Sequence, residues 1–427
     1  MKDTISAVRV TPIAFRDPPL LNAAGIHEPY ALRSIIELET ASGLIGLGES
    51  YGDADTLADL ERVAPALIGL DPFLLNELTR RVESLTVNRA DTGLNLAPGT
   101  HGDKVTMRVV SAFEVACHDL MGQLTGRPVH ELLGGKVRDS VPYSAYLFFK
   151  YAEHLNSPYQ KDDWGEALTP AQVVAQAQRM IGEYGFHSIK LKGGALEPGI
   201  EADTVRALAA AFPGMPLRID PNANWSVDLA VELGEELGSL LEYYEDPTPT
   251  LEGMAELHRR TGLPLATNMV VTSAAEFKRN ATLNGVQVVL SDHHYWGGLR
   301  ATQQLAAMCG TFGLGLSMHS NSHLGISLMA MTHLAASVPN LTYACDTHYP
   351  WQDEEVVAGG RIKFENGGLK VPDAPGLGVT LDRDALERLH QQYLTCGIRR
   401  RDDAGQMRRY DPAFEGLTPR FTARAKV

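Results

Sequence analysis

The stretch HSIKLKGG, residues 187–194, places two lysines on one face of a predicted strand. Side chains alternate between the two faces of a strand, so Lys190 and Lys192 point to one side while Ile189 and Leu191 point to the other. Lysines on a solvated edge strand would show the same pattern. The apolar neighbours and the helical patterns on both sides favour an inner strand. Its two ammonium groups would then point to the same place.

Short apolar runs alternate with amphipathic helical patterns from about residue 141 onward. Eight such runs in about 200 residues describe a (β/α)8 barrel more simply than an open doubly wound sheet. The eight predicted strands are VPYSAYLFF, HSIKLK, LRID, LEYYED, LPLATN, VQVVLSD, LGLSMH and LTYACD.

The first 50 residues have a different pattern, with three alternating runs, AVRVTPIAF, LRSIIELET and GLIGLGES, followed by helical patterns. We therefore expect an α/β protein of two parts. Residues 1–135 would form an α+β capping domain with a three-stranded antiparallel sheet, and residues 136–375 a modified, TIM-like (β/α)8-type barrel. The C-terminal segment, residues 376–427, would pack back on the capping domain and complete it.

The composition is that of an ordinary globular protein. The formal net charge of −14 disfavours nucleic acid and anionic membranes as partners, although it leaves room for a locally positive pocket. No apolar run reaches the roughly 18 residues that span a bilayer, and the start MKDTISAVRVTP lacks the apolar core of a signal peptide. We therefore expect a cytoplasmic protein, with its four scattered cysteines reduced.

Nearly every central strand of the predicted barrel ends in a charged or amide side chain. These residues are Lys192, Asp220, Glu245, Asn268, Asp292 and His319, at successive spacings of 28, 25, 23, 24 and 27. One strand–helix unit has this length, so we expect the side chains to meet at one mouth of the barrel. In this fold the C-terminal mouth holds the active site.

Three of these residues, Asp220, Glu245 and Asn268, offer oxygen ligands from adjacent strands. Oxygen ligands without cysteine or histidine suit Mg²⁺, with Mn²⁺ as second choice, rather than zinc. Taken singly, the two carboxylates are also typical of turns before proline, and Asn268 of a loop. Their place in the row is what favours a metal site.

Groups that can move protons stand on both sides of these ligands, Lys192 before them and His319 with Asp292 after them. A carboxylate beside an imidazole orients the ring and sets its tautomer. A metal between two proton-transfer groups suits removal of a proton α to a carboxylate. His319 and His323 lie four residues apart, as zinc ligands do, but the sequence offers them no third nitrogen or sulfur ligand.

The ordered motifs KLK, DPNANW, YYEDP, LATNMVVT, SDHHYWGGL and HSNSHLGISLMAM resemble the enolase superfamily, mandelate racemase subgroup. Within it the chain is most similar to the glucarate-dehydratase-like members, which use an amide, here in ATNM, as third metal ligand. The likeness covers essentially the whole chain, including LNAAGIHEPYALRS and GIRRRDDAGQM near the ends. The segment from Glu245 to Asn268 is shorter than the family pattern, and the step from Asp292 to His319 is one residue longer.

The resemblance implies a role for each residue in the row. Asp220, Glu245 and Asn268 would bind Mg²⁺. Lys192 would be one base, with Lys190 beside it making it less basic and holding the substrate carboxylate. His319, paired with Asp292, would be the base on the opposite face and the general acid for the departing hydroxide.

The resemblance also implies residues that touch the substrate outside this row. Asn222 and Asn321 would hydrogen-bond the substrate or its enediolate, so Asn222 counts with the catalytic set. Thr106 is an alternative to Thr100 as the threonine that touches the substrate. The basic cluster around Arg401 is also typical of a solvated tail. The residues expected to enclose a diacid are His27, Thr100, Tyr146 and Arg401.

The implied activity is that of a carbon–oxygen lyase: Mg²⁺-dependent dehydration of D-glucarate, or an epimeric hexarate, to 5-dehydro-4-deoxy-D-glucarate. A racemase or epimerase, or a dehydratase of another acid sugar, would use the same residues. A catalytically silent relative that binds acid sugars is an alternative of another class. We expect the partner to be a small dicarboxylate acid sugar and the protein to be a homo-oligomer.

Overall fold

The computed structural model of the chain describes residues 3–86, 104–155 and 161–423. Three antiparallel strands open the fold at the alternating runs: β1 (Ile5–Arg16), β4 (Tyr30–Thr40) and β5 (Ile45–Tyr51). They pair in the order β1-β4-β5. A short hairpin of β2 (Leu21–Asn22) and β3 (Gly25–Ile26) lies between β1 and β4 in the chain.

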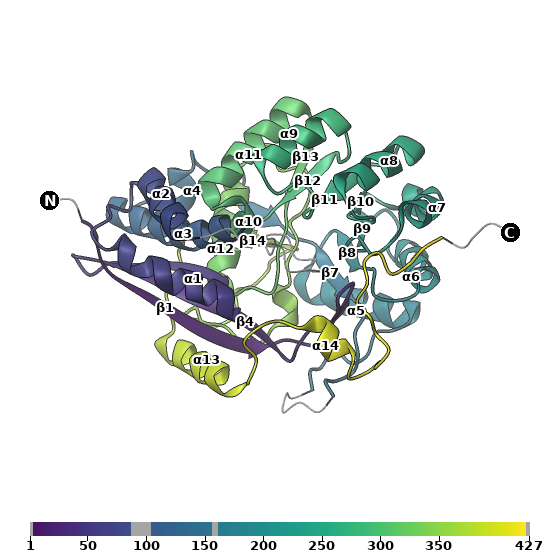
Figure 1. The fold of residues 1–427 in the computed structure, drawn as a ribbon, viewed down its shortest axis with the longest axis horizontal. Helices are drawn as coiled ribbons and strands as arrows, with labels where there is room; N and C mark the ends of the chain where they lie inside the picture. Colours follow the sequence, from purple (N-terminus) through teal and green to yellow (C-terminus); the bar gives the residue numbers. More distant parts are fainter. Residues whose placement is uncertain (1–2, 87–103, 156–160, 424–427) are drawn as a thin grey trace.

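Helices of the first part of the chain lie beside this sheet (Figure 1). They are α1 (Ala54–Val63), the 3-10 turn η1 (Ala64–Leu67), α2 (Leu75–Leu85), α3 (Val105–Thr125) and α4 (Val129–Leu132). The long helix α3 packs on β5 at two glycines, because a methyl group on Gly46 or Gly48 would lie 2.3 Å from a carbonyl oxygen of the helix. Because glycine has no side chain, these two positions allow the strand and the helix to lie this close.

The second part of the chain forms a curled parallel sheet of seven strands with helices around its outside (Figure 1). The strands follow chain order: β7 (Ala145–Phe148), β8 (Ile189–Lys192), β9 (Leu217–Asp220), β10 (Tyr243–Glu245), β11 (Leu265–Thr267), β12 (Val288–Ser291) and β13 (Gly315–Met318). The helices are α5 (Pro170–Tyr184), α6 (Pro198–Ala211), α7 (Val227–Leu237) with η3 (Gly238–Leu240), α8 (Leu251–Thr261), α9 (Ala274–Leu283), α10 (His293–Trp296), α11 (Leu299–Phe312) and α12 (Gly325–Ser337).

The stretch 187–194 is an inner strand, as predicted, because β8 pairs with both β7 and β9. Ile189 and Leu191 belong to the main hydrophobic core. Lys190 and Lys192 are also buried, on the other face of the strand. The edge-strand alternative is therefore wrong, and the two lysines point into the barrel.

The segment LTYACD, predicted as the eighth strand, does not form a regular strand. The segment 341–346 does lie between β13 and the residues before β7, since Asp346 N donates to Met318 O and Cys345 N to Pro142 O, both at 2.9 Å. The carbonyl oxygen of Ala344 accepts hydrogen bonds from two side chains instead of from a neighbouring strand. The donors are Ser317 Oγ at 2.8 Å and Arg218 Nη1 at 2.9 Å. These bonds replace a continuous backbone ladder, so the barrel closes through an irregular segment.

The first predicted run of the barrel is also divided. Its start is β6 (Ser140–Pro142), which pairs with the antiparallel strand β14 (Gly368–Lys370), and only its second half is the barrel strand β7. The 3-10 turn η4 (Tyr349–Trp351) lies between the closing segment and β14 in the chain.

The C-terminal segment contacts both parts of the molecule. Helix α13 (Arg383–Thr395) packs on β1, where His390 Nδ1 lies 2.7 Å from Pro12 O, and α14 (Asp403–Met407) contacts β3. Beyond them the chain turns to the barrel, since Phe421 pairs with Trp225 and Arg420 N donates to Asn224 Oδ1. The expectation that the whole segment packs on the capping domain is therefore corrected for these last residues.

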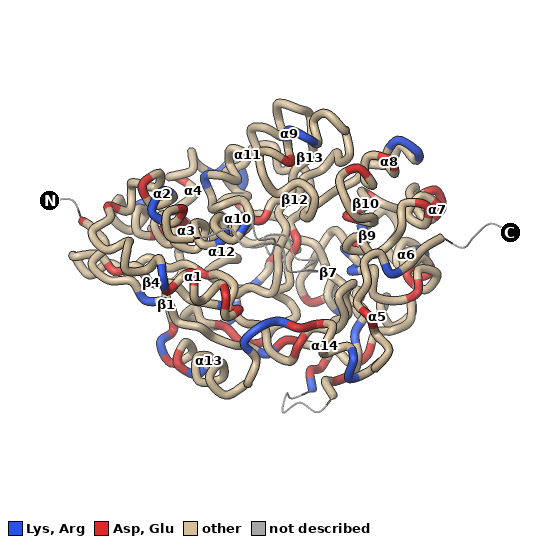
Figure 2. Tube along the Cα trace, in the orientation of Figure 1, with Lys and Arg blue, Asp and Glu red and all other residues tan. Residues whose placement is uncertain are grey.

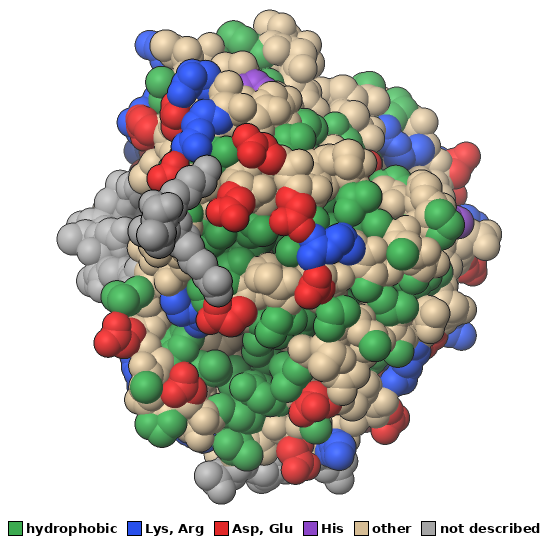
Figure 3. Space-filling model, turned by 90° about the vertical axis from the view of Figure 1, so that its right-hand side faces the viewer, with side chains coloured by type: hydrophobic (Ala, Val, Ile, Leu, Met, Phe, Trp, Pro, Cys, Tyr) green, Lys and Arg blue, Asp and Glu red, His purple; other side chains and the backbone are tan. Residues whose placement is uncertain are grey.

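Lys and Arg are interspersed with Asp and Glu along the chain trace (Figure 2). The face in Figure 3, seen from the right of Figure 1, carries hydrophobic side chains among charges of both signs. Among the described residues, no helix combines the length and hydropathy that a membrane span needs.

The close packing of β5 on α3 makes a stability prediction. Gly48→Ala should lower the free energy of unfolding by about 1–3 kcal/mol, because the new methyl group meets the carbonyl oxygen of Ala112 at 2.3 Å. Gly182→Ala, in helix α5 with nothing within 4 Å, is the matched control and should leave stability unchanged or raise it by about 0.5–1 kcal/mol. Denaturant unfolding followed by circular dichroism measures both, and equal midpoints for Gly48→Ala and the parent chain would contradict this account.

Candidate active site

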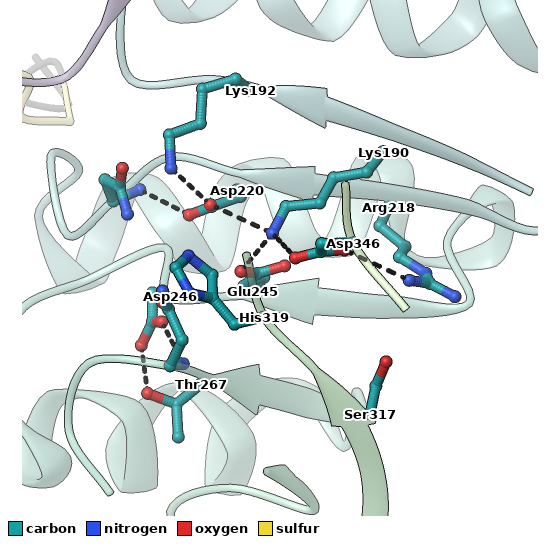
Figure 4. A network of polar contacts seen from close by, with 12 residues as sticks. Lys190, Lys192, Arg218, Asp220, Glu245, Asp246, Thr267, Ser317, His319 and Asp346 are labelled. Carbon is teal, nitrogen blue, oxygen red and sulfur yellow. Dashed lines mark hydrogen bonds and ion pairs between the residues drawn. The ribbon is translucent and has the colours of Figure 1, made fainter. Parts of the chain in front are cut away.

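Lys190 lies at the centre of a buried carboxylate cluster at the barrel mouth (Figure 4). Its Nζ is 2.5 Å from Oε1 of Glu245, 2.7 Å from Oδ2 of Asp346 and 3.5 Å from Oδ2 of Asp220. Burial alone would lower the pKa of Lys190, but the carboxylates outweigh it and raise that pKa well above its usual value. Lys190 is therefore a permanent positive charge in this cluster.

Lys192 lies opposite Asp220 in the register of β8 and β9, with 2.6 Å between its Nζ and Oδ2 of Asp220. Burial alone would raise the pKa of Asp220, but Lys192 and Lys190 lower it to about 2. The two lysines therefore converge on one carboxylate, as the alternation of side chains along the strand predicts.

Asn268 directly follows β11 and is positioned by Asp246. Oδ2 of Asp246 accepts from the backbone N–H of Asn268 at 2.9 Å, and Oδ1 accepts from Thr267 Oγ1 at 2.5 Å. Burial raises the pKa of Asp246 to about 7, and the negative charge of Asp220 adds to this effect. Asp246 thus fixes the residue expected as third metal ligand beside Glu245.

Two oxygen atoms of the expected ligands have no hydrogen-bond donor among the described residues. They are Oε2 of Glu245 and Oδ1 of Asn268, both fully buried. Burial raises the pKa of Glu245 well above its usual value, and the carboxylate of Asp220 raises it further. Buried oxygens without donors are costly, and a divalent cation that prefers oxygen ligands would satisfy them. The donor set therefore fits Mg²⁺.

The backbone after both carboxylates is left-handed. The φ angles are +49° at Asn222, +63° at Ala223 and +35° at Asp246. Residues other than glycine seldom adopt these angles, and such strain clusters at functional sites. Ala223 N donates to Asp246 O at 2.6 Å, so the loops after β9 and β10 are tied together and hold Asp220 beside Glu245.

His319 follows β13 and pairs with Asp292, which follows β12. Its Nδ1 lies 3.1 Å from Oδ2 of Asp292. Burial alone would raise the pKa of Asp292, but His294 and His319 outweigh it and hold that pKa well below its usual range. A carboxylate on Nδ1 leaves Nε2 of His319 as the ring atom available for proton transfer.

Three residues expected to enclose a diacid are held by buried partners. The ring of Tyr146 lies 4.6 Å from Nζ of Lys190. Nδ1 of His27 lies 3.0 Å from Asp17, and Arg401 makes two bonds of 2.7 Å to Asp403. Arg401 is thus oriented by a buried carboxylate, while its own side chain is 39% exposed.

The side chains of the two predicted asparagines are engaged within the protein. Asn321 Nδ2 donates to the hydroxyls of Tyr51 and Tyr295, at 2.8 and 2.7 Å. Asn222 N donates to Asp220 Oδ1 at 3.1 Å, and its Nδ2 lies 3.3 Å from the sulfur of Met269.

Thr100 lies outside the described residues. Its competitor Thr106 hydrogen-bonds Thr86 through the two hydroxyls at 2.7 Å.

The sequence reading missed Asp346 and His348. His348 is buried, its ring lies 4.7 Å from that of Tyr146 and 6.1 Å from that of His27, and its Nδ1 has no partner among the described residues. Burial lowers the pKa of His348 well below its usual value, and the neighbouring basic side chains add to this. Asp346 could have been predicted from the sequence, because it ends the eighth predicted strand 27 residues after His319, at the spacing of the other strand-end residues.

Two family models match this chain. The model described as mandelate racemase / muconate lactonizing enzyme, N-terminal domain, covers residues 5–134. The model described as enolase C-terminal domain-like covers residues 172–385. Together they span most of the capping domain and the barrel.

Individual relatives cover almost the whole chain. A probable glucarate dehydratase of Streptomyces coelicolor is 54% identical over 97% of this chain and 98% of its own. An enolase of Pseudomonas fluorescens, crystallised with magnesium, potassium and tartrate, is 63% identical with a TM-score of 0.97 and covers 99% and 100% of the two chains. An enolase of Thermobispora bispora, crystallised with magnesium and formate, is 53% identical with a TM-score of 0.95 over 98% and 100%.

These matches confirm the predicted modified barrel with a capping domain, the carbon–oxygen lyase class and magnesium as the cofactor of the family. The chain belongs to the enolase superfamily, in its mandelate racemase subgroup.

Proposed function

We propose that the protein is a Mg²⁺-dependent dehydratase of D-glucarate or an epimeric hexarate, which forms 5-dehydro-4-deoxy-D-glucarate. One observation carries the proposal: an oxygen-ligand set lies between a lysine on β8 and a His–Asp pair after β12 and β13. The 54% identical probable glucarate dehydratase and the bound tartrate, a small dicarboxylate, of the solved relative support the substrate class.

Asp220, Glu245 and Asn268 would hold the metal ion, because Oε2 of Glu245 and Oδ1 of Asn268 are buried without donors among the described residues and Asp220 lies beside Glu245 in the cluster around Lys190. When bound, Mg²⁺ would supply positive charge that stabilises the substrate carboxylate as it gains electron density. Lys190, protonated among its carboxylates, adds a second fixed positive charge from the protein.

Proton transfer would be divided between Lys192 and His319. In its neutral form, Nζ of Lys192 takes the proton α to the carboxylate. The β carbon–oxygen bond then breaks, and the protonated imidazole of His319, stabilised by Asp292, donates its Nε2 proton to the departing hydroxyl, which leaves as water. The enol that remains rearranges to the ketone, and solvent restores both side chains. Each positioned acid or base contributes roughly 10²- to 10⁴-fold in rate.

Residues of the capping domain and the C-terminal segment would enclose the far end of the diacid. His27 and Arg401 are each oriented by a buried carboxylate, Asp17 and Asp403 respectively. With Tyr146, Asn222 and Asn321 they would provide cationic and hydrogen-bonding groups for the second carboxylate and the hydroxyls. Thr100 completes the proposed set.

A racemase or epimerase is the second candidate. β8 and β13 are separated by four strands in the sheet, so Lys192 and His319 enter the mouth from different sides. Bases on two sides of a carbon can exchange its proton with inversion, without loss of the hydroxyl.

The first prediction concerns the reaction. Incubation with Mg²⁺ and a panel of hexarates should give an α-keto product that semicarbazide detects, fastest with D-glucarate or one epimer. Solvent deuterium in recovered substrate without ketone would favour the racemase instead. Neither ketone nor exchange with any acid sugar would contradict both candidates and favour a silent acid-sugar-binding relative.

The second prediction separates the base from the metal ligands. Lys192→Met should lower kcat at least about 10³-fold, because it removes the group that takes the α proton. Calorimetry should show Mg²⁺ binding retained, since Asp220 keeps its charge. Lys278→Met, at an exposed position of helix α9, is the matched control and should keep full activity. Turnover in Lys192→Met close to that of the parent chain would refute the assignment.

The third prediction concerns the metal ligands. Glu245→Gln and Asn268→Leu should each weaken Mg²⁺ binding at least about 10-fold, because each removes a ligand oxygen or its charge. Asp228→Asn, an exposed carboxylate of helix α7, is the control. Titration calorimetry without substrate measures all three. Affinities that match the parent chain in both site variants would place the ion elsewhere.

A further inference from the structure

Asp292, the partner of His319, also contacts a second imidazole, that of His294. Oδ1 of Asp292 lies 2.7 Å from Nδ1 of His294 and accepts from the backbone N–H of His294 at 2.9 Å. Oδ2 of Asp292 lies 3.1 Å from Nδ1 of His319. One carboxylate therefore stands between two histidine rings, each facing it with Nδ1.

The far side of the His294 ring determines where its proton lies. Nε2 of His294 is 3.1 Å from Nη2 of Arg33 and 2.9 Å from Oγ of Ser327. A guanidinium group donates hydrogen bonds and accepts none, so Nε2 of His294 must accept. The ring proton is therefore on Nδ1, where it is donated to Asp292.

Arg33 itself is fixed by the capping domain. It lies on β4, and its Nε donates to Oε1 of Glu49 on β5 at 2.8 Å, with both side chains at most 2% exposed. Glu49 also accepts from the backbone N–H groups of Leu324 and Ser327, at the start of α12. The guanidinium thus cannot turn away from His294 without breaking a buried ion pair.

The same residues also suit a metal site by type, because Asp292, His293 and His294 offer ligand atoms within 4.8 Å of one another. The hydrogen bonds argue against that use. Both oxygens of Asp292 and both nitrogens of His294 already have partners, and a guanidinium beside Nε2 repels a cation.

We propose that His294 is a positioning residue for His319. Arg33 holds its proton on Nδ1, His294 then fixes one oxygen of Asp292, and the other oxygen of Asp292 holds the Nδ1–H of His319. Nε2 of His319 is thereby turned toward the substrate, where it gives up a proton when the ring is protonated and takes one when the ring is neutral. This inference rests on the proposed function for the role of His319 as a base and acid, but the tautomers that it requires do not.

The first test reads the tautomers by ¹⁵N NMR of the full-length protein with labelled histidine at neutral pH, without substrate. His294→Asn identifies the His294 signals and retains an amide donor near the Nδ1 position. In the parent chain, His294 and His319 should both carry a proton on Nδ1. In His294→Leu, which removes the donor, His319 should show a mixture of tautomers. A proton on Nε2 of His294, or an unchanged His319 in His294→Leu, would overturn the proposal.

The second test uses kinetics with the best acid sugar. His294→Leu should lower kcat about 10²-fold with KM changed less than about 3-fold, because binding residues are untouched while the acid that assists departure of the hydroxyl loses its orientation. Deuterium exchange at the α carbon, assigned to Lys192, should fall much less than ketone formation. His294→Asn should recover at least about 10-fold of the lost rate.

His293→Leu is the matched control, since His293 is equally buried beside His294 but its Nδ1 has no partner among the described residues. It should keep kcat within about 3-fold. An equal loss in His293→Leu and His294→Leu, or no recovery by His294→Asn, would reduce His294 to a packing residue. Absence of any reaction in the parent chain would refute the proposed function, while the NMR result would still decide the positioning role.

Discussion

The ion cluster around Lys190 is the interaction on which the barrel mouth depends. A buried ammonium is costly unless it is paired, and Lys190 is paired with carboxylates from β9, β10 and the irregular segment that closes the barrel. The ring of Tyr146, on β7, covers the same ammonium. One side chain therefore joins three strands of the sheet to the segment that closes the barrel, and at the same time pairs with the carboxylates of the site. The contacts at the closing segment and the contacts of the site are therefore made by the same residue.

The capping domain contributes side chains that position residues of the barrel site. Arg33 and Glu49, on its central and third strands, reach the residues behind the His319–Asp292 pair. His27, between β3 and β4, and Arg401, in the C-terminal segment, are each paired with a buried carboxylate. Buried charge pairs of this kind add little net stability, but a misplaced partner leaves an uncompensated charge. The arrangement therefore favours one orientation of the cap on the barrel.

Prediction from the sequence was accurate where the signal is periodic and failed where tertiary bonds replace it. Seven of the eight barrel strands form near the predicted runs, and the polar residues at their ends gather at one mouth. The eighth segment follows the same spacing, yet its carbonyl oxygens are taken by Ser317 and Arg218 and no regular ladder forms. His348 was missed because it follows this irregular segment, where neither strand nor helix period marks a buried residue.

The sequence by itself determined which side chains face the barrel interior and at which strand end each stands, because alternation along a strand and the length of a strand–helix unit are local properties. Only the tertiary structure decided the partners: that Asp220 lies beside two lysines, that Asp346 pairs with Lys190, and that Arg33 contacts Nε2 of His294. Those partners come from segments as far as 261 residues apart. Hydrogen-bond direction depends on how the segments meet in space, and no local pattern carries that information.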